Sequence, residues 1–142
     1  MLKKLKMFLV LCLLFVVTYT YAADIPKDYI GDFYLVHSLK FINGEPDGAS
    51  SIIYQTPHLF KLTETSIKFT KTTFSFTNAP ENFKILSTEY EKSDNTKWLK
   101  LKFEQSDVII LLAGSSDSSW VCRLIPDNSS EDDFVQFVLT KK

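Results

Sequence analysis

The chain of 142 residues has few of the residues from which catalytic and metal sites are built. It holds only two cysteines, Cys12 and Cys122, and two histidines, His37 and His58. They form no zinc-binding spacing, and the chain has neither a nucleophile elbow nor a glycine-rich phosphate loop. The sequence therefore predicts no metal site, no catalytic residue and no cofactor. A triad assembled in space from distant residues is the alternative, because a triad is defined by its geometry.

The first 23 residues have the three-part pattern of a secretory signal. Three lysines stand among the first six residues, an uninterrupted apolar run follows from Met7 to Val17, and Thr20 and Ala22 supply small residues. We expect removal of residues 1–22, with cleavage after Ala22 or, alternatively, after Ala23. An uncleaved anchor helix is the other interpretation, but the apolar run is shorter than the ~20 residues that span a bilayer. We therefore expect the mature chain to be secreted or periplasmic, without stable membrane insertion.

Without this leader the chain is mildly acidic and has a single cysteine. Loss of the three leader lysines leaves 13 basic against 17 acidic residues, so the net charge changes from −1 to −4. Nucleic acid is not an expected partner, because phosphates attract clustered basic groups. Residues 23–142 are long enough for one domain with its own core. Cys122 has no partner for an internal disulfide, and its apolar neighbours predict a buried, unreactive thiol rather than an intermolecular bridge or a nucleophile.

After Gly31 the sequence consists of short β-type segments separated by turn residues. Apolar and polar residues alternate in several of them, as around Leu99, Leu101 and Phe103, which indicates strands with one buried face. The expected strands are residues 33–39, 51–63 with an interruption at Pro57, 66–70, 73–77, 83–91, 97–103, 108–113, 120–125 and 134–140. About eight or nine strands with short connections predict an all-β fold, an up-and-down antiparallel barrel of about eight strands. A two-sheet β-sandwich is the alternative.

Local signals set the expected turns. Residues 24–31 read as one helical turn with an early proline, ended by Gly31. Residues 43–48 are dense in turn formers and predict a loop, and residues 93–95 predict a hairpin loop. Residues 83–91 carry apolar side chains at helical spacing, yet their β-branched and aromatic residues favour a strand. Residues 108–113 are apolar throughout, which predicts a strand covered on both faces.

The start of the predicted barrel resembles that of lipocalins and related calycins. Gly31-Asp32-Phe33 follows the predicted helical turn, as a Gly-x-Trp follows one in that family. Thr88-Glu89-Tyr90 is similar to the family's Thr-Asp-Tyr motif. The family's third element is an arginine near the end of the barrel that packs over the first-strand aromatic ring, and Arg123 is the only arginine of this chain. The resemblance implies a barrel around a small apolar ligand, with these residues in structural roles.

The motifs depart from the family pattern at two positions. Phe33 stands where the family has tryptophan, and Glu89 stands where it has aspartate. If Arg123 stacks on Phe33, the contact contributes about 0.5–2 kcal/mol. The alternative is that Arg123 points outward from its strand.

Two binding functions follow from an exported barrel. In the first, the barrel carries or sequesters a small hydrophobic ligand, since about eight strands enclose either side chains or one small molecule. In the second, the protein is a protein-binding module or enzyme inhibitor that acts through the loops at residues 43–50, 114–119 or 126–133. Trp98 and Trp120 are then candidate anchors, and ordinary sheet packing is the alternative role for both. An enzyme is the third and least favoured interpretation.

Overall fold

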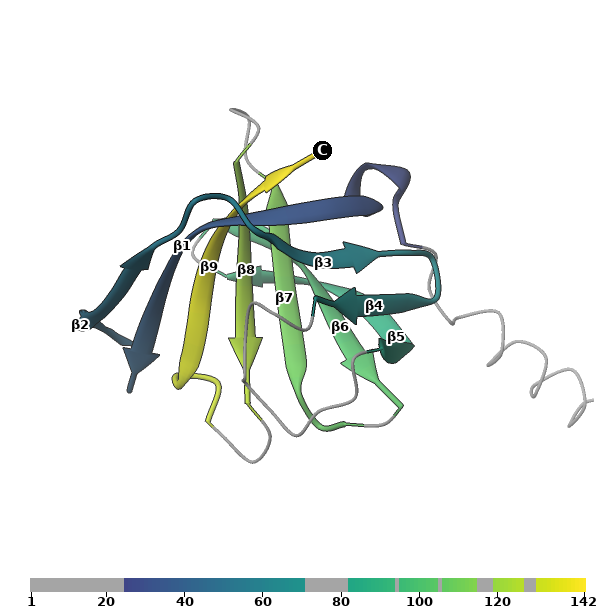
Figure 1. Cartoon of the computed structure of the whole chain (residues 1–142). Helices are drawn as coiled ribbons and strands as arrows, with labels where there is room; N and C mark the ends of the chain where they lie inside the picture. Colours follow the sequence, from purple (N-terminus) through teal and green to yellow (C-terminus); the bar gives the residue numbers. More distant parts are fainter. Residues whose placement is uncertain (1–24, 71–81, 94, 105, 115–118, 127–129) are drawn as a thin grey trace, which may run out of the picture.

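The computed structural model describes residues 25–70, 82–93, 95–104, 106–114, 119–126 and 130–142. These residues form one short helical turn and nine strands, so the predicted all-β fold is confirmed (Figure 1). The elements are η1 (Lys27–Tyr29), β1 (Gly31–Ile42), β2 (Glu45–Ile53), β3 (His58–Leu62), β4 (Ser66–Phe69), β5 (Asn82–Ser93), β6 (Thr96–Phe103), β7 (Ile109–Gly114), β8 (Ser119–Ile125) and β9 (Phe134–Lys141).

Eight of the nine strands close into an antiparallel barrel. In the order β1-β3-β4-β5-β6-β7-β8-β9 each strand pairs with the next, and β9 pairs again with β1 over the register from Phe33↔Lys141 to Phe41↔Phe134. Among the described residues the outer strand β2 pairs only with the C-terminal half of β1, from His37 to Ile42. It therefore projects from the barrel (Figure 1). The predicted eight-stranded barrel is confirmed, with one strand added outside the ring.

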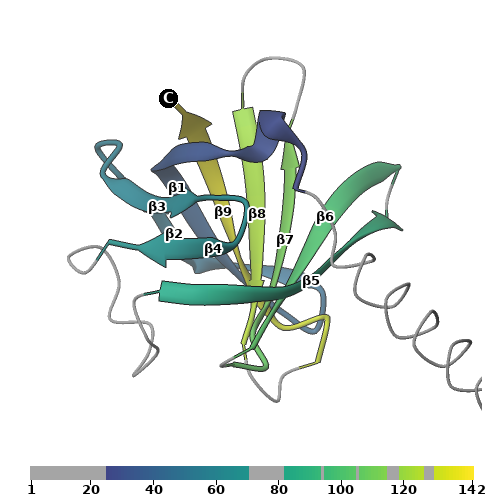
Figure 2. The ribbon, with the colours of Figure 1, turned by 90° about the vertical axis from the view of Figure 1, so that its right-hand side faces the viewer.

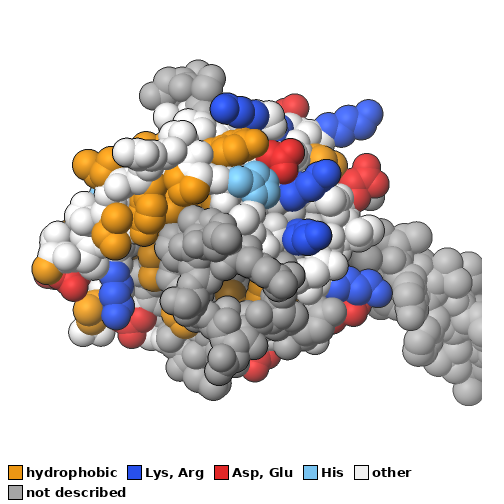
Figure 3. Space-filling view, in the orientation of Figure 1, with side chains coloured by type: hydrophobic (Ala, Val, Ile, Leu, Met, Phe, Trp, Pro, Cys, Tyr) orange, Lys and Arg blue, Asp and Glu red, His pale blue; other side chains and the backbone are white. Residues whose placement is uncertain are grey.

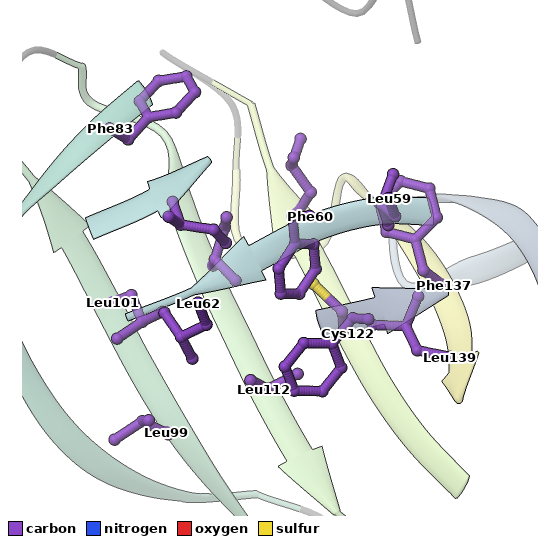
Figure 4. Packing of buried hydrophobic residues seen from close by; sticks show 14 of the residues in the cluster. Leu59, Phe60, Leu62, Phe83, Leu99, Leu101, Leu112, Cys122, Phe137 and Leu139 are labelled. Atoms are coloured by element: carbon purple, nitrogen blue, oxygen red, sulfur yellow. The ribbon is translucent and has the colours of Figure 1, made fainter. Parts of the chain in front are cut away.

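The centre of the barrel is packed with apolar side chains. Inward-facing residues of all eight barrel strands form one cluster, part of which Figure 4 shows. A side chain that lines a water-sized cavity keeps accessible surface there, whereas close packing removes it. Twelve members of the cluster keep less than 2 % of their surface: Phe33, Phe60, Phe137, Leu35, Leu59, Leu62, Ile67, Leu99, Leu101, Ile110, Leu112 and Leu139. Around these residues the barrel is filled rather than hollow.

A second apolar cluster covers part of the outer face. It contains Trp98 and Leu111, which alternate with inward-facing Leu99 and Leu112 on β6 and β7. Further members are Ala113, Ile125 and Phe134, with Phe41, Ile109 and Val121 packed against them. The uninterrupted apolar run at residues 108–113 is thus explained, because β7 is buried on both faces.

The predicted loop at residues 43–48 is wrong in length. Asn43 and Gly44 have φ angles of 53° and 79°, which closes the β1–β2 hairpin with a turn of two residues. The strand β2 then begins at Glu45, and Pro46 lies within it opposite Phe41. Proline is tolerated there because β2 pairs with one described strand only, so its missing N–H breaks no ladder on a second side.

The other local predictions have mixed outcomes. The helical turn is present as η1, but Ile30 caps it and Gly31 is the first residue of β1, so Gly31 does not end the turn. The segment at 83–91 is a strand, within β5, and Pro57 lies in the break between β2 and β3. A hairpin joins β5 to β6, as predicted, but Ser93 belongs to β5 and pairs with Thr96. The strand expected at 73–77 lies outside the described residues.

Candidate functional site on the outer arm

Gly31 and Phe33, the first two motif residues, both have structural roles. Gly31 has a φ angle of 145°, and a Cβ atom there would lie 3.0 Å from Cε of Lys141, so the position suits glycine. Phe33 is fully buried inside the barrel. Its ring stacks on Phe60 at 4.8 Å between centroids and meets the edge of Trp120 at 5.4 Å. Gly31 and Phe33 thus fix the start of β1, the first strand of the barrel.

Arg123 does not pack over Phe33. Its neighbours Cys122 and Leu124 face the interior, so strand alternation turns Arg123 to the outer face. The guanidinium carbon lies 4.6 Å from the ring centroid of Trp98 and 4.7 Å from that of Phe134. Its Nε atom donates a hydrogen bond to Oε1 of Gln136 at 3.0 Å. Arg123 therefore points outward from its strand, which was the alternative, and it does not form the contact with the first-strand aromatic ring that the resemblance implies.

The motif at residues 88–90 does not form a shared site either. Its side chains alternate along β5. Thr88 Oγ1 is buried and has no hydrogen-bond partner among the described residues. The Glu89 carboxylate lies 3.8 Å from Nζ of Lys100, and Nζ of Lys97 lies 4.1 Å from the ring centroid of half-exposed Tyr90. These contacts support the β5–β6 hairpin and gather no reactive groups.

The two tryptophans are packing residues rather than exposed anchors. Trp98 retains 4 % of its surface, beneath the guanidinium of Arg123. Trp120 packs against the interior cluster, and its ring meets the edge of Tyr29 at 5.1 Å. The alternative of ordinary sheet packing is therefore confirmed for both.

An acid on β1, an imidazole on β3 and a hydroxyl just after β4 are joined by hydrogen bonds. Nε2 of His58 lies 2.9 Å from Oδ1 of Asp32, and Nδ1 of the same ring is hydrogen-bonded to Oγ1 of Thr70. The order is that of a catalytic triad, but the side chains of His58 and Asp32 are 32 % and 42 % exposed. Neither of the two grooves described below includes these residues. The two bonds tie β1 and β3 to Thr70, the residue after β4.

Cys122 is buried, as the sequence predicts, and burial raises the pKa of its thiol to about 12. Because the thiolate is the reactive form, we expect the chain from Ala23 onward to react with a disulfide reagent at pH 8 about a thousandfold more slowly when folded than in denaturant. Above pH ~9 the unfolded thiol ionises while the folded one keeps its proton, so stability falls as the pH rises. Colorimetric thiol titration measures both rates, and equal rates would contradict the buried position.

Three exposed apolar side chains lie on the hairpin of β1 and β2 (residues 37–53), which we call the arm, and its β1 half also pairs with β9 in the ring. Ile42, Ile52 and Ile53 are 45 %, 51 % and 82 % exposed. They are three of the five large apolar side chains that are exposed in the described part of the chain, the others being Leu86 and Tyr90. Figure 3 shows apolar side chains gathered on this side of the molecule. Ile52 and Ile53 are successive residues at the end of β2 and point to opposite faces of it, whereas Ile42 lies beside the turn, opposite Glu45.

The arm is held firmly against the barrel. Phe41 stacks on Phe134 of β9 with centroids 4.7 Å apart. At the turn, the backbone N–H of Asn43 donates to Oδ1 of Asp133, and that of Gly44 donates to the carbonyl of Asp132, each at 2.8 Å. The arm therefore presents its isoleucines in a fixed geometry, which lowers the entropy cost of binding.

Acidic groups surround the tip of the arm. A groove of about 400 Å³ lies between the turn and the outer face of the barrel, where Lys100 and Arg123 line it. Lys100 Nζ lies 3.7 Å from Glu91 and 3.9 Å from Glu131, so nearby carboxylates already balance its charge. The acidic residues at the arm tip and the adjoining loop are Glu45, Asp47, Glu131, Asp132 and Asp133.

The backbone edge of β2 is poorly suited to pairing with another strand. Its register against β1 shifts between Ser38 and Lys40, where the hydroxyl of Ser50 accepts a hydrogen bond from Lys40 N at 2.9 Å. The same hydroxyl donates to the carbonyl of Asp47 at 2.6 Å. Together with Pro46, this irregular stretch breaks the flat edge that strand addition requires. The arm is therefore suited to contacts through its side chains and not to the addition of another strand along β2.

Comparison with protein-family models, with curated proteins and with solved structures gave no match to this chain. The closed barrel is compatible with a lipocalin-like fold. In the described residues no helix has both the length and the apolar character to cross a membrane. Within the same residues, histidine, cysteine and acidic side chains form no group of three or more that is placed to hold a metal ion.

Proposed function

We propose that the protein is an exported binding module that engages a partner protein through the arm. The observation that carries the proposal is the exposure of Ile53, at 82 %, beside Ile52 on a strand that lies outside the barrel. Apolar side chains that leave water on association supply most of the free energy of protein binding. Export rests on the predicted leader at residues 1–22.

The packing of the barrel favours this function over that of a carrier. A ligand at the barrel centre needs room between inward-facing side chains, and Leu35, Leu101 and Leu112 have no surface left uncovered. An apolar ligand there has to displace packed side chains, which lowers its affinity. The carrier function remains a hypothesis with less support.

The charges around the arm indicate the kind of partner. Glu45 lies opposite Ile42 in the register of the hairpin, Asp47 lies opposite Lys40, and the carbonyl of Asp132 accepts a hydrogen bond from the turn residue Gly44. Complementary charge speeds association and excludes like-charged partners. A fitting partner therefore presents an apolar depression with basic side chains at its rim, and we expect its association to slow as salt is added.

The replacement Ile53→Ser is expected to weaken binding of the partner about tenfold, because it removes the most exposed apolar side chain from the contact. The measurement is an affinity capture from the extracellular fluid of the source organism, with the chain from Ala23 onward immobilised. Captured proteins are quantified by mass spectrometry.

The matched control is Leu86→Ser, which removes an apolar side chain that is 56 % exposed on β5, outside the arm. The wild type and this control are expected to retain the same protein, and Ile53→Ser is expected to retain about a tenth as much. Equal retention by all three chains would remove the arm from the proposal. A small molecule found by native mass spectrometry inside the unmodified barrel would restore the carrier function.

A further inference from the structure

The wall of the barrel is incomplete along one side of β5. The short strand β4 pairs with β5 only at Asn82, Phe83 and Lys84, and the N–H of Ile85 adds one bond to the carbonyl of Thr65. Beyond this point β5 continues to Ser93, paired with β6 on its other side. Figure 2 shows β5 running past the end of β4. The remaining edge of β5 is therefore left without a strand partner among the described residues.

A groove occupies this gap. It has a volume of about 590 Å³ and is lined by Ile25, Pro26 and Lys27, by the β3–β4 turn and by residues 84–88 of β5. Sites for small molecules commonly have volumes of about 300–1,000 Å³. The groove is separate from the arm, and it is a lateral site outside the packed barrel centre.

The lining residues combine an aliphatic wall with positive charge. Ile25, Ile85 and Leu86 supply the aliphatic surface, and Leu86 is 56 % exposed. Two lysines, Lys27 and Lys84, and one acid, Glu64, line the groove, although the overall charge of the chain is negative. Lys84 also lies 3.7 Å from Glu104, which is exposed enough for a ligand to compete with it. Apolar surface next to ammonium groups suits an anion with an apolar body.

One polar atom in the wall of the groove is unsatisfied. Thr88 lines the groove, and its Oγ1 atom is buried without a hydrogen-bond partner among the described residues. Buried polar atoms are nearly always bonded, so each exception needs an explanation. Because this atom has no accessible surface, a ligand in the groove reaches it only if the Thr88 side chain rotates about its Cα–Cβ bond.

We propose that this lateral groove binds a small amphipathic anion. The apolar body of the ligand lies against Ile25, Ile85 and Leu86, and its negative group lies near Lys27 and Lys84. This site is independent of the arm, so binding of the anion and binding of the partner protein are tested separately.

The test is a titration of the chain from Ala23 onward with sodium hexyl sulfate, followed by amide chemical shifts in NMR. We expect saturable shifts that are largest at Ile25, at Lys27 and at residues 84–88. Hexanol has the apolar chain without the charge, and sodium sulfate has the charge without the chain. Each is expected to bind at least tenfold more weakly than hexyl sulfate. Saturable shifts centred on any other surface, or shifts that rise linearly over the whole molecule, would overturn the proposal.

Three variants and a control sharpen the result. Leu86→Asp puts a negative charge on the exposed apolar wall and is expected to weaken binding at least tenfold. Lys84→Gln removes one positive charge, Thr88→Val removes the unsatisfied hydroxyl, and each is expected to weaken binding about threefold. Ile53→Ser changes the arm only and is expected to leave the affinity unchanged. If Leu86→Asp folds and binds hexyl sulfate as the wild type does, the groove is not the site.

Discussion

Replacement of Phe33 by alanine is expected to lower the free energy of unfolding by about 3–5 kcal/mol. Phe33 keeps none of its surface and packs on Phe60 and Trp120, so alanine leaves a cavity that surrounding strands fill only in part. Urea denaturation followed by tryptophan fluorescence measures the change. The control Leu86→Ala, at an exposed position, is expected to change the stability by less than about 0.5 kcal/mol.

The same variant tests whether the interior is filled. An engineered apolar cavity stays dry and takes up a small apolar molecule such as benzene, whereas a packed core does not. We therefore expect benzene to stabilise Phe33→Ala against heat and to leave the wild type unchanged. Stabilisation of the wild type by benzene, or a loss below about 1 kcal/mol on replacing Phe33, would indicate a hollow barrel.

Replacement of Gly31 by alanine is expected to cost about 1–3 kcal/mol of stability, because a residue with a side chain is strained at this φ angle. The added Cβ atom would also approach Cε of Lys141 to 3.0 Å, although that flexible side chain can move away. Most of the cost is therefore backbone strain at the first residue of β1. Thermal unfolding followed by circular dichroism measures it.

Gly48→Ala is the matched control for Gly31→Ala. A Cβ atom at Gly48 meets nothing within 4 Å, so this replacement is expected to change the stability by less than about 0.5 kcal/mol. Equal losses from the two replacements would show that the positive φ angle at Gly31 has no special cost. There would then be no conformational reason for a glycine at position 31, where calycins also have one.

The strands could be predicted from the sequence because alternation of apolar and polar residues is a local signal. It located β6, whereas an uninterrupted apolar run located β7. Alternation also decides the position of Arg123, since Cys122 and Leu124 on either side face inward. The family resemblance pointed instead to a contact between Arg123 and Phe33. Local periodicity was the better guide at this position, because one step along a strand reverses the face.

The arm could not be predicted in the same way. The sequence places Ile52 and Ile53 in a strand without telling which strand it pairs with. They are exposed because β2 pairs with the C-terminal half of β1 and takes no place in the ring. The line of Asp32, His58 and Thr70 was equally hidden, since its members lie 26 and 12 residues apart in the chain. Both features depend on long-range pairing, which leaves no local pattern.

The central claim is that the arm is the surface that contacts a partner protein, and site-specific photo-crosslinking tests it most directly. Ile53→p-benzoylphenylalanine and, as control, Leu86→p-benzoylphenylalanine are made in the chain from Ala23 onward and irradiated in the extracellular fluid of the source organism. We predict a light-dependent adduct with the mass of one protein at position 53 and none at position 86. An adduct of that protein at position 86 alone, or no protein adduct at position 53, would contradict the claim.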